Sequence, residues 1–93
     1  MVETDDAQLK RLRIRSWRRG TREMDLILGP FADHDLRALA AAERDHYERL
    51  LNENDGDLYA WVSGRIAAPE DYAALIELIR SKTEDRSDFA QPL

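Results

Sequence analysis

The residues best suited to chemistry lie together in the segment Arg18-Arg19-Gly20-Thr21-Arg22-Glu23. Three arginines, a glycine and a carboxylate occupy six consecutive positions. The planar guanidinium of arginine donates hydrogen bonds in a fixed fork that suits carboxylates, phosphates and aromatic faces. Glycine permits a turn or the close approach of a partner. We interpret these six residues, which we name the arginine corner, as the candidate functional site, which the other helices hold in place.

A purely structural role would also explain the arginine corner. Cations are favoured at the C-terminal end of a helix, and a glycine commonly ends one. Glu23 would then pair with Arg19 or Arg22 on the surface, where such pairs contribute about 0–1 kcal/mol. Residue types and spacing alone leave both interpretations open.

The rest of the chain offers little other catalytic or metal-binding chemistry. It has no cysteine, its serines lie in no nucleophile elbow, and its four glycines form no phosphate-binding loop. His34 and His46 lack a second histidine at i+3 or i+4 to complete a metal site, so we expect both to be ordinary surface histidines. The segment Asn52–Asp57 faintly resembles a calcium loop, but its first and last ligands would be Leu51 and Val62, which cannot coordinate. We predict a protein that is not an enzyme and binds no metal or nucleotide cofactor by itself.

The charges are distributed unevenly along the 93 residues. The net charge is −5, yet Lys10–Arg22 contains seven basic residues and no acids, which leaves about −12 on the remainder. This split predicts a basic patch on an acidic body, and the body would repel a phosphate backbone. No apolar run approaches the roughly 20 residues that cross a bilayer, and the acidic N-terminus resembles no targeting peptide. We expect a cytoplasmic, soluble protein.

Apolar residues recur at helical spacing along most of the chain, and no strand-like alternation or repeat occurs. The pattern predicts an all-α fold, a compact bundle of four to five short helices. Residues 1–93 would form one domain, with a flexible tail after about residue 83.

The first two helices are predicted to meet at the arginine corner. Thr4 can cap a first helix that ends at Gly20. A second helix begins at about residue 21. Because Gly29-Pro30 interrupts its pattern, it either stops near Leu28 or continues, kinked, to about Asp33.

Three further helical segments follow. The first runs from Leu36 to Leu51, before a polar turn. Asp55 or Asp57 can cap a short helix that stops at Gly64, and Pro69 is a good start for the last helix.

The aromatic residues divide into predicted core and surface positions. Tyr47, Trp61 and Tyr72 fall on apolar stripes and are expected to pack in the core. Tyr59 lies off the stripe and is expected to be half exposed. Trp17 lies one turn before the glycine of the arginine corner, so it would either support the corner or join a contact surface.

The order of residues adds a family resemblance. Arg19-Gly20-Thr21-Arg22-Glu23 matches the RGxxE motif of the succinate dehydrogenase flavinylation factors, the SdhE-like assembly proteins. The similarity covers roughly Arg18 to Trp61. Its further elements are Met24-Asp25, Pro30-Phe31, Tyr47-Glu48-Arg49-Leu50-Leu51, Asp55, Asp57-Leu58 and Trp61.

The resemblance implies a five-helix assembly chaperone. Such a protein binds the flavoprotein subunit of succinate dehydrogenase, and sometimes that of fumarate reductase, and promotes covalent attachment of FAD to a histidine of that subunit. The chemistry is thought to be the client's own, so FAD would belong to the client and the chaperone would bind no cofactor. We expect a monomer.

The resemblance also indicates which residues contact the client. Arg19, Gly20 and Glu23 occupy the motif positions, where charge-assisted hydrogen bonds and close backbone approach would act. Thr21 stands where many relatives have a larger apolar residue, so the apolar part of the contact is expected to be smaller here. The neighbours expected to join the surface are Arg18, Arg22, Asp25 and Trp17.

Two functions of another class remain as alternatives. The basic segment Lys10–Arg22 would also suit a small regulator that binds nucleic acid, or an antitoxin-like module. The charge of about −12 on the remaining residues disfavours the first.

Overall fold

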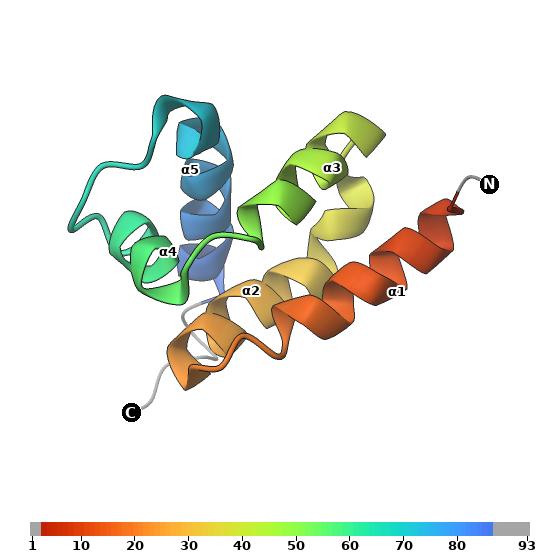
Figure 1. Cartoon of the computed structure of the whole chain (residues 1–93), viewed down its shortest axis with the longest axis horizontal. Helices are drawn as coiled ribbons and strands as arrows, with labels where there is room; N and C mark the ends of the chain where they lie inside the picture. The colour runs from red at the N-terminus through yellow and green to blue at the C-terminus, as the bar shows by residue number, and fades with distance from the viewer. Residues whose placement is uncertain (1–2, 87–93) are drawn as a thin grey trace.

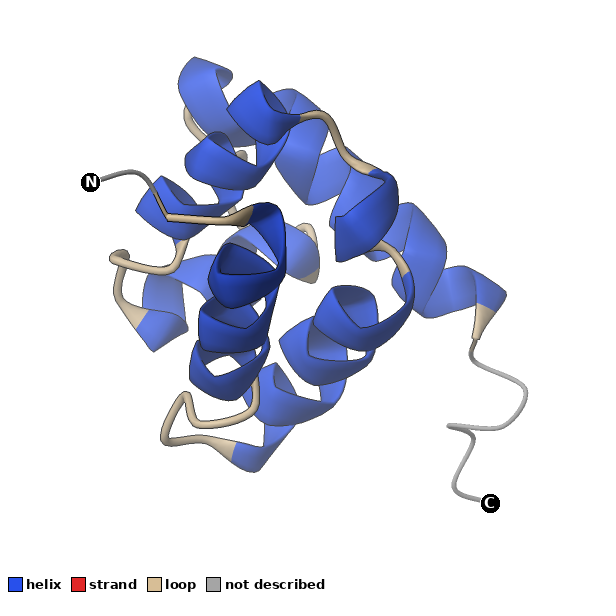
Figure 2. Ribbon diagram, turned by 90° about the vertical axis from the view of Figure 1, so that its right-hand side faces the viewer, coloured by secondary structure: helices blue, strands red, loops and turns tan. Residues whose placement is uncertain are grey.

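A computed structural model describes residues 3–86 of the chain, and these contain only helices and loops (Figures 1 and 2). The prediction of an all-α bundle is therefore confirmed. The elements are α1 (Asp5–Ser16), α2 (Arg22–His34), the 3₁₀ turn η1 (Leu36–Ala38), α3 (Ala41–Leu50), α4 (Asp55–Val62) and α5 (Glu70–Asp85).

Helix α2 is the central element of the bundle. It packs against α1 on one side and against α4 and α5 on another. Figure 1 shows α1 and α2 running side by side along the lower part of the molecule, while α5 stands at a steep angle to α2. The arginine corner connects α1 to α2, so its position depends on both helices.

The core gathers buried apolar side chains from all five helices and η1. Met24, Leu28 and Phe31 lie at i, i+4 and i+7 on α2 and are almost completely buried, as the spacing predicts. The ring of Phe31 stacks on that of Tyr47 with centroids 5.4 Å apart. Burial raises the pKa of the Tyr47 hydroxyl, which shares a hydrogen bond of 2.7 Å with the Ser16 hydroxyl.

The first helix begins as predicted but ends earlier. The Thr4 hydroxyl accepts a hydrogen bond from the Ala7 amide at 3.1 Å and so caps α1. The helix is capped at its other end by Trp17 and not by Gly20, so the predicted end is wrong. Gly20 has a φ of +103°, but this conformation belongs to the loop, which has already turned towards α2.

Helix α2 continues through Gly29-Pro30 to His34, one residue beyond the longer of the two predicted alternatives. Proline at position 30 removes the amide that would bond to the carbonyl of residue 26. The residue that loses this bond, Leu26, is 53% exposed, so the gap in the hydrogen-bond ladder lies near solvent.

The predicted single helix from Leu36 to Leu51 is wrong. The chain forms η1, then takes an extended conformation at Leu39 and Ala40 before α3 begins. Side chains satisfy the backbone at this break. The Ala40 amide donates to Glu43 Oε1 at 3.0 Å, and Arg44 Nη1 donates to the Leu39 carbonyl at 2.7 Å.

The cap of α4 also differs from the prediction. Asn54 caps this helix, because its side-chain oxygen accepts from the amides of residues 56 and 57 at 2.7 and 3.3 Å. Asp55 and Asp57 lie in the first turn instead, where the helix dipole favours carboxylates. Gly64 follows the helix with a φ of +83°, as predicted for its stop.

Helix α5 begins after Pro69, as predicted, and continues to Asp85. It therefore includes the first residues of the segment expected to be flexible, while residues 87–93 lie outside the described part of the chain. None of the helices within residues 3–86 is long and apolar enough to span a membrane.

Candidate functional site

The side chain of Arg19 points into the protein. It is only 11% exposed, and its Nε donates to Asp55 Oδ1 at 2.8 Å. Its two terminal nitrogens donate to the carbonyls of Leu51 and Glu53 at 2.6 and 2.9 Å. All three nitrogens of the guanidinium are thus used to join the α1–α2 loop to the turn between α3 and α4.

Backbone contacts hold the same loop against the start of α2. The Arg19 amide donates to Asp25 Oδ1 at 2.7 Å, and the Thr21 hydroxyl accepts from the Met24 amide at 3.3 Å. Between these contacts, Gly20 is exposed and takes its positive φ. A Cβ at this position would lie 3.7 Å from Asp55 Oδ2, an ordinary contact. The glycine is therefore required by the backbone conformation and not by a lack of space.

The other charged residues of the corner face solvent. Arg18, Arg22 and Glu23 are exposed, and none of their side chains forms an ion pair or hydrogen bond with the described residues. The pairing of Glu23 with Arg19 or Arg22, which a purely structural role would require, does not occur there. These three side chains are available to a partner.

A hollow of about 270 Å³ lies beside the exposed residues of the corner. Thr21 and Glu23 line it from the start of α2, and Asp55, Gly56 and Tyr59 line it from α4. Tyr59 is 38% exposed, which agrees with the prediction of half exposure. A partner that contacts Glu23 would therefore also meet the first turns of α4.

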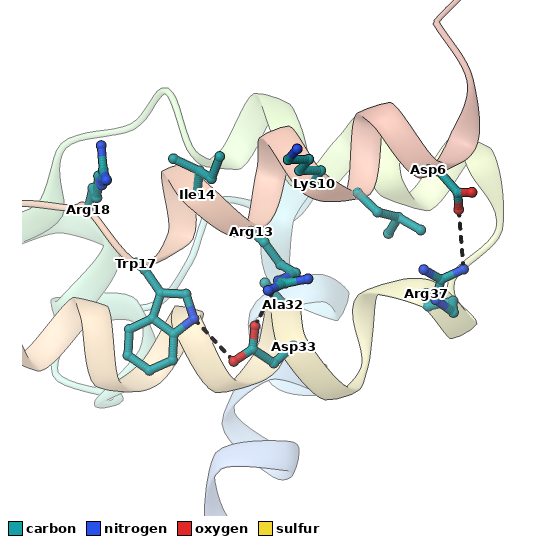
Figure 3. A pocket seen from close by; sticks show the side chains of 10 residues that line it. Asp6, Lys10, Arg13, Ile14, Trp17, Arg18, Ala32, Asp33 and Arg37 are labelled. Atoms are coloured by element: carbon teal, nitrogen blue, oxygen red, sulfur yellow. Dashed lines mark hydrogen bonds and ion pairs between the residues drawn. The ribbon is translucent and has the colours of Figure 1, made fainter.

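Trp17, the residue that caps the C-terminal end of α1, also supports the arginine corner. Its indole ring lies over Gly29 of α2 so closely that a Cβ at this position would overlap the ring. The indole Nε1 donates to Asp33 Oδ2 at 3.2 Å, as Figure 3 shows. Trp17 is still 39% exposed, so it both supports the loop and reaches the surface. The sequence shows Gly29 only as a helix breaker and does not reveal this contact.

The predicted basic patch is largely neutralised. Because the acidic residues of other segments reach four of its seven cations, only Lys10, Arg18 and Arg22 stay without an ion pair to the described residues. Hydrogen bonding to Arg11 holds the pKa of the Glu48 carboxyl below its ordinary value. The pairs are Arg11 with Glu3 and Glu48, Arg13 with Asp33, Arg15 with Glu48, and Arg19 with Asp55.

The histidines lie in different surroundings. His34 is exposed, as predicted. His46 is half-buried instead of lying on the surface, because its ring packs against the edge of Tyr72 with centroids 5.3 Å apart. Tyr72 also packs near Trp61 and donates to Glu53 Oε2 at 3.0 Å. Across residues 3–86, no three histidine, aspartate or glutamate side chains gather in a group that could hold a metal ion.

Comparison with known proteins gives one family. The family model described as flavinator of succinate dehydrogenase, Sdh5, matches residues 10–83. The FAD assembly factor SdhE of Pectobacterium atrosepticum is 35% identical over 75 residues, which cover 78% of this chain and 84% of the relative.

Two mitochondrial relatives are also similar, and both are succinate dehydrogenase assembly factors 2. The protein of Schizosaccharomyces pombe is 41% identical over 68 residues, 73% of this chain and 49% of the relative. The protein of Mycosarcoma maydis is 38% identical over 71 residues, 76% of this chain and 30% of the relative. The chain thus matches at most about half the length of these two proteins.

Proposed function

This chain belongs to the Sdh5 family, the flavinators of succinate dehydrogenase, and we propose that it is an assembly chaperone for covalent flavin attachment. It would bind the flavoprotein subunit of succinate dehydrogenase and promote covalent attachment of FAD to that subunit. The observation that carries the proposal is the family match over residues 10–83, which includes the whole arginine corner. The names of the relatives, an FAD assembly factor and assembly factors of succinate dehydrogenase, support it.

We propose that the chain contributes binding and no catalytic group. FAD would be held by the client, and the chaperone would stabilise the client arrangement in which the flavin and its acceptor histidine react. The hollow beside Glu23 is small, about 270 Å³, and its lining contains two carboxylates. Such a surface suits a protein contact better than the phosphates of a dinucleotide.

The contacts of the arginine corner suggest two different roles for its residues. Arg22, Glu23 and Arg18 would form charge-assisted hydrogen bonds with the client, because they are exposed and have no side-chain partner among the described residues. Gly20 would let the client approach the exposed backbone of the loop. Arg19 would act by positioning this loop, as would Asp25 and Trp17, although all three are also neighbours of the contact.

We also propose a second client protein for this chain, together with its oligomeric state and its location in the cell. The flavoprotein of fumarate reductase would be a second client, and the chaperone would act as a monomer in the cytoplasm. Size-exclusion chromatography with light scattering measures the mass of the free chain, and co-purification from anaerobically grown cells tests the second client.

The function is tested by deleting the gene and measuring covalent flavin on the succinate dehydrogenase flavoprotein. Flavin that remains attached on a denaturing gel fluoresces, and an immunoblot of the same gel measures the amount of subunit. We expect the ratio of fluorescence to subunit to fall strongly in the deletion strain and to be restored by the wild-type gene. An undiminished ratio under aerobic growth would contradict the proposal.

A further inference from the structure

A second surface feature lies apart from the hollow beside Glu23. A groove of about 540 Å³ runs between α1 and the segment formed by α2 and η1 (Figure 3). Lys10, Ile14 and Arg18 follow one another at intervals of four residues along one side of this groove, which places them on one face of α1 and its C-terminal turn. Trp17 lies between this face and α2.

The groove exposes apolar surface in a chain that buries most of its large apolar side chains. Ile14 is 47% exposed and Trp17 is 39% exposed, and both line the groove. Ile14 belongs neither to the buried core nor to the half-buried residues that pack against it, so core packing does not explain its position. Isoleucine and tryptophan side by side in a groove are the kind of apolar centre found in protein contacts.

The charges around this apolar centre are predominantly positive. The two carboxylates that line the groove are already paired, Asp33 with Arg13 at 3.1 Å and Asp6 with Arg37 at 3.5 Å. Lys10 and Arg18 also line it, and neither has an ion-pair partner within residues 3–86. Two cations that are unpaired in this part of the chain therefore flank the exposed isoleucine.

We propose that this α1–α2 groove binds an acidic segment of the client flavoprotein, which places an apolar side chain between Ile14 and Trp17. The proposal rests on the proposed function. Arg18 follows Lys10 by eight residues, six of them within α1, so at a rise of about 1.5 Å per residue the two positions are on the order of 12 Å apart. An extended peptide spans this distance in three to four residues. The matching segment thus has two acidic residues three to four positions apart and an apolar residue between them.

Nucleic acid fits the same groove poorly. The chain outside Lys10–Arg22 carries a charge of about −12. This charge repels a nucleic acid, which has one phosphate per nucleotide, more strongly than a segment with two carboxylates that Lys10 and Arg18 can neutralise. An exposed isoleucine at the centre also favours an apolar side chain over a nucleotide base.

The test uses calorimetry to measure how tightly two matched double variants of the full chain bind the purified flavoprotein subunit. Lys10→Glu/Ile14→Ser replaces one cation of the groove by an anion and removes the apolar side chain of Ile14. Arg65→Glu/Ile66→Ser makes the same changes in the exposed loop between α4 and α5, where Ile66 is 57% exposed. We expect the groove variant to bind about tenfold or more weakly, with a smaller salt dependence, and the loop variant to bind within about twofold of wild type.

The outcomes separate this inference from the proposed function. If both double variants bind like wild type while Glu23→Ala does not bind, the chaperone function stands and the groove proposal is wrong. If the wild-type chain does not bind the subunit, both proposals fail. Circular dichroism of each variant ensures that equally folded proteins are compared.

A single labelled position identifies what occupies the groove. Because the chain has no cysteine, Ile14→Cys labelled with benzophenone maleimide carries its photoreactive group at one known place. Irradiation with the flavoprotein subunit should join it to a segment that has the acidic and apolar pattern given above. Attachment only to basic or uncharged segments, or tight salt-sensitive binding of a single-stranded DNA 20-mer in place of the subunit, would overturn the proposal.

Discussion

Arg19 and Arg22 lie three residues apart in the same motif, but they have opposite surroundings. The Arg19 side chain is 11% exposed and makes two hydrogen bonds to the α3–α4 turn and one to Asp55 at the start of α4. Arg22 is exposed, and its side chain has no partner among residues 3–86. The arginine corner therefore combines a structural part, which shapes the loop, with an exposed part, which we propose as the contact with the client.

The structural part also explains a distant element of the family resemblance. Asp55 lies 36 residues after Arg19 and accepts its Nε, and it also lines the hollow beside Glu23. A carboxylate at this position thus fixes the loop and shapes the surface next to the exposed part. The two parts of the motif are linked through α4, which lies far from them in the sequence.

The largest effect on stability is expected for Arg19→Ala. The variant leaves the Asp55 carboxylate and two carbonyls without their donor, in surroundings that are largely buried. We expect the free energy of unfolding to fall by about 2–4 kcal/mol, measured by urea denaturation with circular dichroism. Arg22→Ala is the matched control and should change it by less than about 0.5 kcal/mol. Equal effects of the two changes would remove the distinction between the parts of the motif.

A smaller loss of stability is expected for Gly20→Arg. The φ of +103° at this position is unfavourable for any residue with a Cβ, and such strain costs about 1–3 kcal/mol. The side chain has room, because a Cβ added at this position would have Asp55 Oδ2 as its nearest neighbour, at 3.7 Å. The protein should stay folded while the bulky arginine blocks the approach of the client. Circular dichroism of the variant checks that it is folded, and covalent flavin on the client flavoprotein in cells that express the variant checks the loss of function.

The helices could be predicted where they depend on apolar spacing. The positions of Met24, Leu28 and Phe31 already indicate the buried face of α2, and the glycine at 64 indicates the end of α4. The break at Leu39 could not be predicted in this way. It depends on hydrogen bonds from Arg44 and to Glu43, and apolar periodicity contains no information about them.

The order of residues predicts where the candidate site lies in the chain. It does not predict the internal geometry of the site. The sequence places Arg19 and Glu23 in one motif and gives no sign that one turns inward and the other outward. The partners of the Arg19 guanidinium lie 32 to 36 residues away, and two of them are backbone carbonyls, which any residue type provides. The roles proposed for the exposed residues stay predictions.

Gly29→Ala tests the second support of the loop. Alanine is favoured over glycine within a helix by about 0.5–1 kcal/mol, but its Cβ would overlap the Trp17 ring. We expect the displaced ring to lose its packing and its hydrogen bond to Asp33. The free energy of unfolding should therefore fall by about 1 kcal/mol in total. In a Trp17→Ala background the same change should instead stabilise the protein. Urea denaturation of the four proteins gives both signs, and a stabilising effect in both backgrounds would show that the contact is unimportant.

The smallest effect on stability, and the sharpest separation of the two parts, is expected for Glu23→Ala. Its side chain is exposed and forms no ion pair or hydrogen bond with the described residues, so the free energy of unfolding should change by less than about 0.5 kcal/mol. Covalent flavin on the client should nevertheless be lost, because the carboxylate would no longer reach the client. Glu23→Gln keeps the shape and removes the charge, so a partial loss in this variant would identify a charge-assisted hydrogen bond. A destabilised Glu23→Ala protein would show that Glu23 has a structural role. Full flavinylation activity in this variant would place the client contact at other exposed residues of the corner, Arg18 and Arg22 first.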